Sequence, residues 1–178
     1  MVLEKKPELH TPARIERMQV DDIAAVVELD KKCFPVPWSA SAYATEIHNT
    51  SAYYTVARAD GRMIGYAGMW LIMDEAHITT IGVAPEFRRR KIGERILIDL
   101  LDEAIHRGAR RVTLEVRRSN AAAQKLYDKY YFHTVAVRRG YYTNNNEDAI
   151  VMWIDDLWDT AFLKTFKRRK EELGITDE

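Results

Sequence analysis

The sequence predicts one mixed α/β domain whose central sheet is partly parallel. Its first half contains two short helical patterns followed by three β-rich runs, which indicates antiparallel strands. The second half has the order strand, helix, strand, helix, strand, which is typical of a parallel crossover. A length of 178 residues favours a single domain, and a hydrophobic content of 47% excludes disorder over the whole chain.

The first half is expected to begin with a strand and two helices. Asp21 and Asp22 offer an N-cap to the first helix, Pro35 and Pro37 end it, and Ser39 can cap the second. Asp60 is followed by a glycine, a pair that predicts a tight hairpin. The predicted strands cover residues 13–19, 52–59, 62–73 and 76–83.

The second half is expected to alternate helices with strands. A long amphipathic helix follows Gly93 and ends at Gly108. A strand at residues 111–117 comes next, then a short helix to about residue 130, then two strands at 132–139 and 149–154 around a polar loop. A last helix is expected within residues 155–178, with Phe162 and Phe166 on its apolar side and the charge run 167–170 in solvent.

Composition narrows the class of protein. The chain has 27 basic and 27 acidic residues, and its single cysteine, Cys33, rules out an intrachain disulfide and suits a reducing, cytoplasmic setting. The N-terminus shows no apolar stretch, so we expect no signal peptide, and the longest strongly apolar run, residues 66–73, is too short to span a membrane. The five histidines lack ligand spacing, so no metal site is expected.

Charge is unevenly distributed along the chain. Residues 83–139 contain 14 Lys and Arg against seven Asp and Glu. A neutral protein with one basic region is suited to a compact anion rather than to DNA. The basic loop Arg88–Gly93 lies between a predicted strand and a helix start, where free backbone N–H groups can bind phosphate. A pyrophosphate cradle and a solvated basic loop are equally good interpretations of this loop taken alone.

The segment Val83–Leu97 resembles motif A of the GCN5-related N-acetyltransferases. That family binds acetyl-CoA through a (Gln/Arg)-x-x-Gly-x-(Gly/Ala) loop, and this chain has Arg88-Arg89-Arg90-Lys91-Ile92-Gly93. Lys91 replaces the first glycine, and we expect an ordinary φ there and assistance to the phosphates from its charge. The cofactor-binding residues that the resemblance implies are Ile81, Gly82, Val83, Arg88, Arg89, Arg90, Lys91, Ile92, Gly93, Glu94 and Asn120.

Three further segments resemble the RimI branch of this family: Phe34–Trp38, Leu114–Tyr127, and Arg138–Tyr142 with the following residues 146–149. The resemblance covers about residues 13–155. It implies a mostly antiparallel sheet of six to seven strands, flanked by helices and splayed at the cofactor site. We therefore expect a flexible N-terminus over residues 1–12, an acetyltransferase domain over 13–155 and a helical extension over 156–178.

The same branch implies a substrate and a mechanism. Its enzymes acetylate protein N-terminal amines, and their best-known target is the alanine terminus of a small-subunit ribosomal protein. By spacing alone, Glu115 is a solvent-facing strand carboxylate, Tyr127 a core aromatic and Asn120 an N-cap. The resemblance instead assigns Glu115 as general base and Tyr127 as general acid. An α-ammonium with a pKa near 7.7–8.0 is easier to deprotonate than a lysine at about 10.4.

The resemblance also implies that Tyr141 and Tyr142 contact the first residues of the acceptor, with Trp38 as the opposite wall; otherwise they are ordinary edge aromatics or a half-buried tryptophan. We expect Cys33 to be a buried small hydrophobe rather than an acyl carrier. The leading hypothesis is an N-α-acetyltransferase, acting as a monomer or homodimer without DNA or membrane partners. The alternatives are a small-amine or lysine acetyltransferase, a non-catalytic acyl-CoA sensor and a nucleic-acid-binding module.

Overall fold

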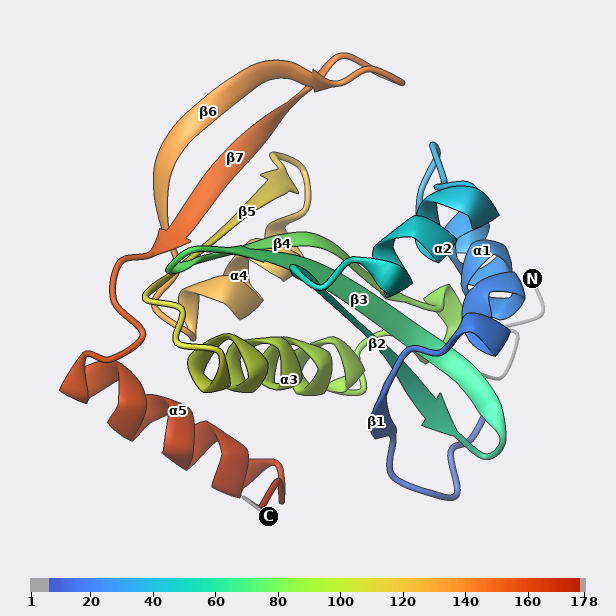
Figure 1. Cartoon of the computed structure of the whole chain (residues 1–178), viewed down its shortest axis with the longest axis horizontal. Helices are drawn as coiled ribbons and strands as arrows, with labels where there is room; N and C mark the ends of the chain where they lie inside the picture. The colour runs from blue at the N-terminus through green and yellow to red at the C-terminus, as the bar shows by residue number, and fades with distance from the viewer. Residues whose placement is uncertain (1–6, 177–178) are drawn as a thin grey trace, which may run out of the picture. The chain divides into compact units, whose positions relative to one another are not determined.

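A computed structural model describes residues 7–176 and contains a seven-stranded sheet with the strand order β1-β2-β3-β4-β5-β7-β6 (Figure 1). The strands are β1 (Arg14–Arg17), β2 (Ala52–Ala59), β3 (Arg62–Ile72), β4 (Glu75–Val83), β5 (Arg111–Arg117), β6 (His133–Tyr142) and β7 (Glu147–Ile154). The helices are α1 (Ile23–Cys33), α2 (Ala40–His48), α3 (Ile92–His106), α4 (Ala121–Asp128) and α5 (Thr160–Glu172), with short 3-10 turns at Val20–Asp22 and Pro85–Phe87. The predicted mixed, mostly antiparallel sheet is confirmed.

Contacts along the chain separate two compact units. The first contains Met1–Gly68 and Thr80–Leu100, and the second contains Met69–Thr79 and Leu101–Glu178. Three elements, β3, β4 and α3, continue from one unit into the other. Each unit has its own set of fully buried apolar side chains.

In the first unit, β2 and β3 support the start of α3. A Cβ added to Gly65 would lie 2.8 Å from the Ile96 side chain, so this glycine allows α3 to approach the strand closely. The turn between β2 and β3 uses positive φ at both Asp60 (49°) and Gly61 (73°), as the predicted tight hairpin requires. Near the N-terminus, the His10 and Thr11 N–H groups donate to the Asp60 carboxylate at 2.9 and 3.0 Å.

The two N-terminal helices are joined by a turn that a buried carboxylate organises. Asp30, on α1, is 2% exposed, accepts a hydrogen bond from the Tyr66 hydroxyl and accepts another from the Trp38 N–H at 2.6 Å. Ser39 caps α2, as predicted, by accepting from the Ala42 N–H at 3.2 Å. The turn that carries Trp38 is therefore tied to α1 by a side chain rather than by regular secondary structure.

In the second unit, β5 is the junction between parallel and antiparallel pairing. It pairs in parallel with β4 from Glu75–Arg111 to Ile78–Leu114, and the pairing ends there although both strands continue. On its other side it pairs antiparallel with β7, and β7 pairs antiparallel with β6. The strands β6 and β7 form a long curved hairpin in Figure 1, longer than the sequence predicted. As a result, Tyr141 and Tyr142 lie at the end of β6 and not in a loop.

The last helix, α5, packs through aromatic side chains. Phe162 and Phe166 are 2% and 4% exposed, stack with ring centroids 5.5 Å apart, and are accompanied by the buried Leu157. The expectation that the whole charge run 167–170 faces solvent was wrong at its last residue. Lys170 is 8% exposed and its Nζ lies 2.7 Å from Asp102 on α3, because an ion pair offsets the cost of burying the ammonium.

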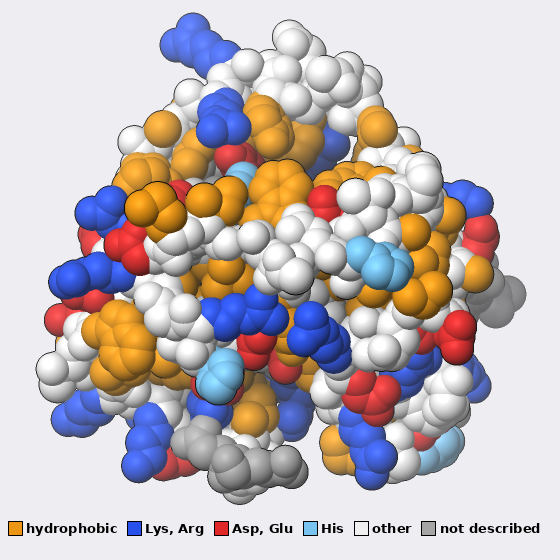
Figure 2. All heavy atoms as spheres, in the orientation of Figure 1, with side chains coloured by type: hydrophobic (Ala, Val, Ile, Leu, Met, Phe, Trp, Pro, Cys, Tyr) orange, Lys and Arg blue, Asp and Glu red, His pale blue; other side chains and the backbone are white. Residues whose placement is uncertain are grey.

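The surface carries both signs of charge. Basic and acidic side chains are interspersed on the face drawn in Figure 2, in keeping with equal numbers of each. None of the helices within residues 7–176 has the length and apolar character needed to cross a bilayer.

Candidate active site

The loop between β4 and α3, in the first unit, has an unusual backbone. Arg89 and Lys91 have φ values of 69° and 62°, so the expectation of an ordinary φ at Lys91 was wrong. The left-handed conformation that a glycine adopts easily is imposed here on two long side chains, at a cost of about 1–2 kcal/mol per residue. Left-handed residues next to right-handed or extended ones direct backbone N–H groups into one concavity, which is a feature of anion sites.

The start of α3 adds to this character. The first helical hydrogen bond is donated by the Arg95 N–H to the Lys91 carbonyl at 3.0 Å, so the N–H groups of Ile92 and Gly93 precede it. A Cβ at Gly93 would touch only the Val83 side chain, at 3.7 Å, so the approach to this helix end is open. Backbone donors, the helix dipole and basic side chains are together the features of an anion-binding helix start.

The four basic side chains of the loop are not equivalent. Arg88 turns back and donates from Nε to the Val83 carbonyl at 3.0 Å, and Arg90 lies 5.7 Å from the centre of the Phe87 ring. Arg89 and Lys91 are exposed, and within the described part of the chain neither makes an ion pair. These two side chains are therefore the ones available to a phosphate, whereas Ile92 and Glu94 are buried in the first turn of the helix.

The end of β4 is tightly packed. Gly82 is buried, and a Cβ there would lie 2.4 Å from Cε1 of Tyr66, so only glycine fits without movement of that ring. The Val83 carbonyl accepts from Arg88 and lies 3.5 Å from Sγ of Cys33. Burial raises the pKa of the Cys33 thiol, which opposes thiolate formation. Ile81 and Val83 are half-buried on either side of this glycine.

Glu115, in the second unit, lies in a polar cluster on β5. Its Oε2 is 2.7 Å from Nε2 of His77, its Oε1 is 3.0 Å from a terminal nitrogen of Arg138, and its side chain is only 9% exposed. The hydrogen bond with His77 is the main cause that lowers the pKa of Glu115, and it prevails over burial, which acts in the opposite direction. The carboxylate is thus ionised at neutral pH and held from both sides.

His77 and Arg138 were missed in the sequence. The register pairs His77 with Thr113, and Glu115 is two residues further along the same strand, so the two side chains share one face of the sheet. Recognising the parallel pairing of β4 with β5 would have predicted their contact. Arg138 could not be found in this way, because β6 reaches β5 only through β7 and the register of β6 with β7 already shifts between Thr134 and Ala136.

Tyr127 and Asn120 belong to α4. Tyr127 is 8% exposed and its ring centre lies 5.5 Å from that of Phe132. Burial raises the pKa of Tyr127, so the phenol keeps its proton throughout the neutral range. Asn120 caps the helix, as expected from its position, by accepting from the Ala123 N–H at 3.1 Å.

The two predicted substrate tyrosines are held by arginines. The Arg117 guanidinium carbon lies 3.8 Å from the centre of the Tyr142 ring, and that of Arg138 lies 5.5 Å from the Tyr141 ring. The two rings are nearly perpendicular, with centroids 5.2 Å apart. Burial raises the pKa of Tyr142 to about 12. Glu147 accepts from Arg117 at 3.0 Å and from the Ser119 N–H at 2.8 Å, which ties the end of β5 to β7.

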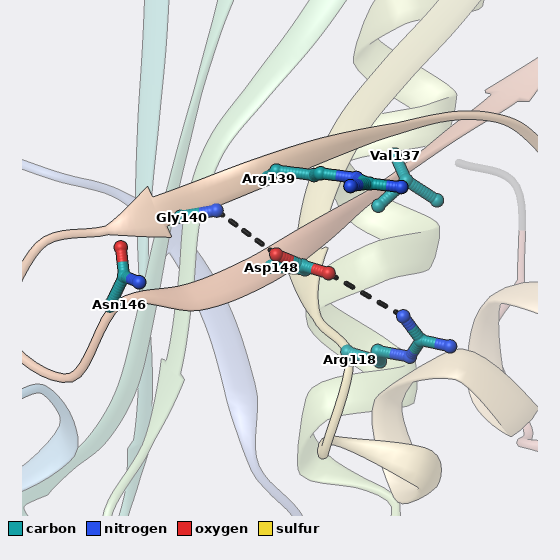
Figure 3. Close-up of a pocket in the computed structure, with 6 residues that line it drawn as sticks. All are labelled: Arg118, Val137, Arg139, Gly140, Asn146 and Asp148. Carbon is teal, nitrogen blue, oxygen red and sulfur yellow. Dashed lines mark hydrogen bonds and ion pairs between the residues drawn. The ribbon is translucent and has the colours of Figure 1, made fainter.

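An open hollow of about 610 Å³ lies beside the β6–β7 hairpin (Figure 3). Asp148 organises it by accepting from the Gly140 N–H at 3.0 Å and pairing with Arg118 at 3.4 Å. Gly140 has a φ of 59°, and a Cβ there would lie 2.5 Å from the Asn146 side-chain oxygen. The lining residues are Arg118, Val137, Arg139, Gly140, Asn146 and Asp148.

Trp38, the predicted opposite wall of the acceptor site, is half-buried in the first unit. Its ring centre lies 5.6 Å from that of Tyr43 and 6.4 Å from that of Tyr54. Among the described residues, no group of three or more His, Cys, Asp and Glu side chains could hold a metal ion.

Comparison with known proteins places these residues in a family. Residues 23–132 match the model of the acetyltransferase (GNAT) family. The chain belongs to the GNAT acetyltransferase family. It is an N-acetyltransferase, and members of this family take the acetyl group from acetyl-CoA.

Two relatives are similar over most of the GNAT chain. A putative [ribosomal protein bS18]-alanine N-acetyltransferase from Bacillus subtilis is 38% identical, covering 82% of this chain and 97% of the relative. The N-alpha-acetyltransferase RimI of Mycobacterium tuberculosis is 37% identical, covering 79% and 91%. The crystal structure of the ribosomal-protein-S18-alanine N-acetyltransferase from Escherichia coli has a TM-score of 0.75 at 30% identity, covering 84% of this chain and 97% of that one.

Proposed function

We propose that this GNAT enzyme acetylates the N-terminal amine of a ribosomal protein, with alanine as its first residue. The observation that carries this proposal is the similarity to bS18-alanine N-acetyltransferases, which extends over nearly their whole length. An ionised, largely buried Glu115 supports the same chemistry. An α-amine is deprotonated near neutral pH far more easily than a lysine.

In this mechanism the amine attacks the thioester directly while Glu115 takes its proton. Acetyl-CoA supplies an activated acetyl group. The loop Arg89–Gly93 holds the phosphates, and Asn120 and the end of β4 contribute to binding the rest of the coenzyme. Tyr127 returns a proton to the leaving sulfur, whose thiol has an ordinary pKa of about 8.5. Burial raises the pKa of Tyr127 and so keeps the proton that a general acid must carry, although it also makes the phenol a weaker acid than an exposed tyrosine.

In this proposal, three aromatic residues bind the acceptor peptide. We assign Tyr141 and Tyr142 to the first residues of the acceptor, because Arg117 and Arg138 fix both rings at the exposed end of the hairpin. Trp38 is assigned to the same substrate from the RimI resemblance of Phe34–Trp38 alone, and the Asp30 carboxylate fixes its backbone. In this proposal the enzyme acts in the cytoplasm, where its protein substrate is made.

The test is thiol release from acetyl-CoA with short peptides that begin with Ala, Ser, Met or Gly. An N-blocked peptide with an internal lysine is the matched control. We expect turnover only with free N-termini and the fastest turnover with alanine. Acetylation of the blocked peptide would contradict the N-terminal specificity. Binding of acetyl-CoA without turnover on any peptide would favour a small-amine acceptor or a sensor.

A further inference from the structure

The contact between His77 and Glu115 joins a nearly buried group to a more exposed one. Nε2 of His77 is 2.7 Å from Oε2 of Glu115, while the side chains are 33% and 9% exposed. The ring of Trp70, on β3, meets the His77 ring edge to face at 6.1 Å and 87°, which restricts the orientation of the imidazole. The carboxylate therefore has one neighbour that can both accept a proton and exchange it with water.

The proton balance of the reaction gives such a neighbour a role. A base that removes a proton from an α-ammonium must release it before the next turnover. An ordinary carboxyl group has a pKa about 3.4 units below that of an α-amine, so the transfer to it is unfavourable by more than about 10³-fold. The pKa of Glu115 is lowered further by its partners. An imidazole has an ordinary pKa of about 6.5, which is nearer to the pKa of the amine than that of a carboxyl group is, by about two units.

We propose that His77 is the proton outlet of Glu115 and a positioning residue for it, an inference that rests on the proposed N-terminal acetyltransferase function. The ammonium N–H bond breaks as Glu115 accepts the proton. The proton passes from Oε2 of the carboxyl group to Nε2 of His77 when the ring carries its own proton on Nδ1, because only that tautomer has a free lone pair at Nε2. The resulting imidazolium releases a proton to water, and exchange of the ring proton with solvent restores the Nδ1–H tautomer for the next turnover. The net change is one proton moved from the amine to solvent, with no electrons transferred.

Charged groups around the pair are suited to this step. Arg138 lies beside Oε1 of Glu115, and its positive charge favours the ionised form of Glu115 once the proton has been released. Among the described residues, the further titratable or charged groups recorded near the cluster are Arg117 on β5, Tyr141 and Tyr142 on β6 and Glu147 on β7, and β3 contributes the uncharged Trp70. His77 is thus the imidazole in direct contact with the carboxylate.

The kinetic test compares the pH profiles of kcat/KM for wild type, His77→Gln and His77→Ala with an alanine-initiated peptide. Glutamine can still donate a hydrogen bond to Glu115 but cannot carry a proton. We expect kcat/KM of His77→Gln to fall about tenfold or more at pH about 7, and to come within about threefold of wild type at pH about 9.5, where the amine is already neutral. Added imidazole should partly restore His77→Ala at pH about 7.

His106→Gln, at an exposed position of α3, is the matched control and should behave as wild type. A defect of His77→Gln that is constant across the pH range would show a purely structural role and overturn the proposal. So would unchanged kcat/KM. If the wild-type enzyme acetylates peptides and Glu115→Gln is inactive, such a result removes the outlet but leaves the proposed function intact.

A second measurement needs no substrate. The His77 ring can be observed by NMR in the free enzyme and in Glu115→Gln, with His77→Gln used to assign its signal. Because the imidazole is in direct contact with the Glu115 carboxylate, we expect the ring signals of His77 to shift in Glu115→Gln. Unchanged ring signals would show that the two groups are not in contact and would overturn the proposal even if no acceptor had been found.

Discussion

The loop before α3 and the cluster around Glu115 are built in opposite ways. The distinctive features of the loop come from its backbone: positive φ values at Arg89 and Lys91, free space around Gly93 and the start of a helix. The cluster uses side chains, with each oxygen of Glu115 in contact with a different residue. A backbone site tolerates changes of residue type as long as the φ values are kept, whereas a side-chain site depends on the identity of each member. This difference leads to four predictions.

Glu115→Gln should have the largest effect. We expect kcat to fall by about 10²–10⁴-fold, because the amide keeps the shape but cannot accept the proton, with little change in acetyl-CoA affinity. Steady-state kinetics and calorimetric titration with acetyl-CoA measure the two quantities. Glu103→Gln, which breaks an ion pair with Arg107 on α3, is the matched control and should retain wild-type turnover. Unchanged turnover in Glu115→Gln would remove Glu115 as the base.

Gly82→Ala tests the packed end of β4. The added Cβ would lie 2.4 Å from the ring of Tyr66, which is fully buried and whose hydroxyl donates a hydrogen bond to Asp30. Because this ring cannot move freely, we expect the free energy of unfolding to fall by about 1–3 kcal/mol. Gly93→Ala is the control, because its Cβ would meet only Val83 at 3.7 Å. Urea unfolding of both variants gives the comparison. Equal stabilities would mean that Tyr66 moves aside without cost.

Lys91→Gly should stabilise the protein. Glycine removes the cost of a left-handed φ, so we expect a gain of about 1 kcal/mol and a Tm higher by about 2–4 °C. The affinity for acetyl-CoA should fall by about fivefold at most, because an exposed ion pair contributes no more than about 1 kcal/mol. Arg90→Gly, at a position without positive φ, should lower the Tm. A drop in Tm for Lys91→Gly would show that the lysine side chain is structurally needed.

Glu147→Gln should give the smallest effect. Hydrogen bonds from Ser119, with further help from Arg117, lower the pKa of Glu147 to about 2. A lowered folded-state pKa stabilises the protein above the ordinary carboxyl pKa, and this contribution is lost as the pH falls toward 2. The variant should therefore be less stable than wild type at neutral pH, and urea unfolding should show the difference narrowing between pH about 5 and about 3. A difference that does not vary with pH would argue against a charge effect.

Local patterns predicted most of the fold. The bounds of β2 and β5 agree with the periodicity of the sequence, and the Ser39 and Asn120 caps follow from residue type alone. The length of the β6–β7 hairpin was harder to predict, because β6 is exposed along nearly its whole length and its sequence lacks the alternation of apolar and polar residues that marks a half-buried strand. Lys170 was placed wrongly for a related reason: its partner, Asp102, is 68 residues away in the chain, and local charge patterns carry no sign of such a pair.

Only part of the candidate site could be predicted from the sequence. The motif resemblance named the loop and Glu115 as site residues, and these assignments remain proposals. The partners of Glu115 depend on strand register: His77 follows from the parallel register of β4 with β5, whereas Arg138 reaches Glu115 only through the registers of β6 with β7 and of β7 with β5. The left-handed φ at Lys91 was also outside sequence reasoning, since a lysine gives no local sign that the surrounding fold will impose a glycine-like conformation.

The exposed strand β6 has a consequence for self-association. It is the last strand of the sheet, and an unpaired edge of this kind can recruit a strand from another copy and so start aggregation. Two irregularities in its register, together with the polar His133 and the charged Arg138 and Arg139, interrupt the flat, apolar edge that the addition of another strand requires. Replacing those arginines to improve crystallisation or solubility would thus carry a risk of fibre formation.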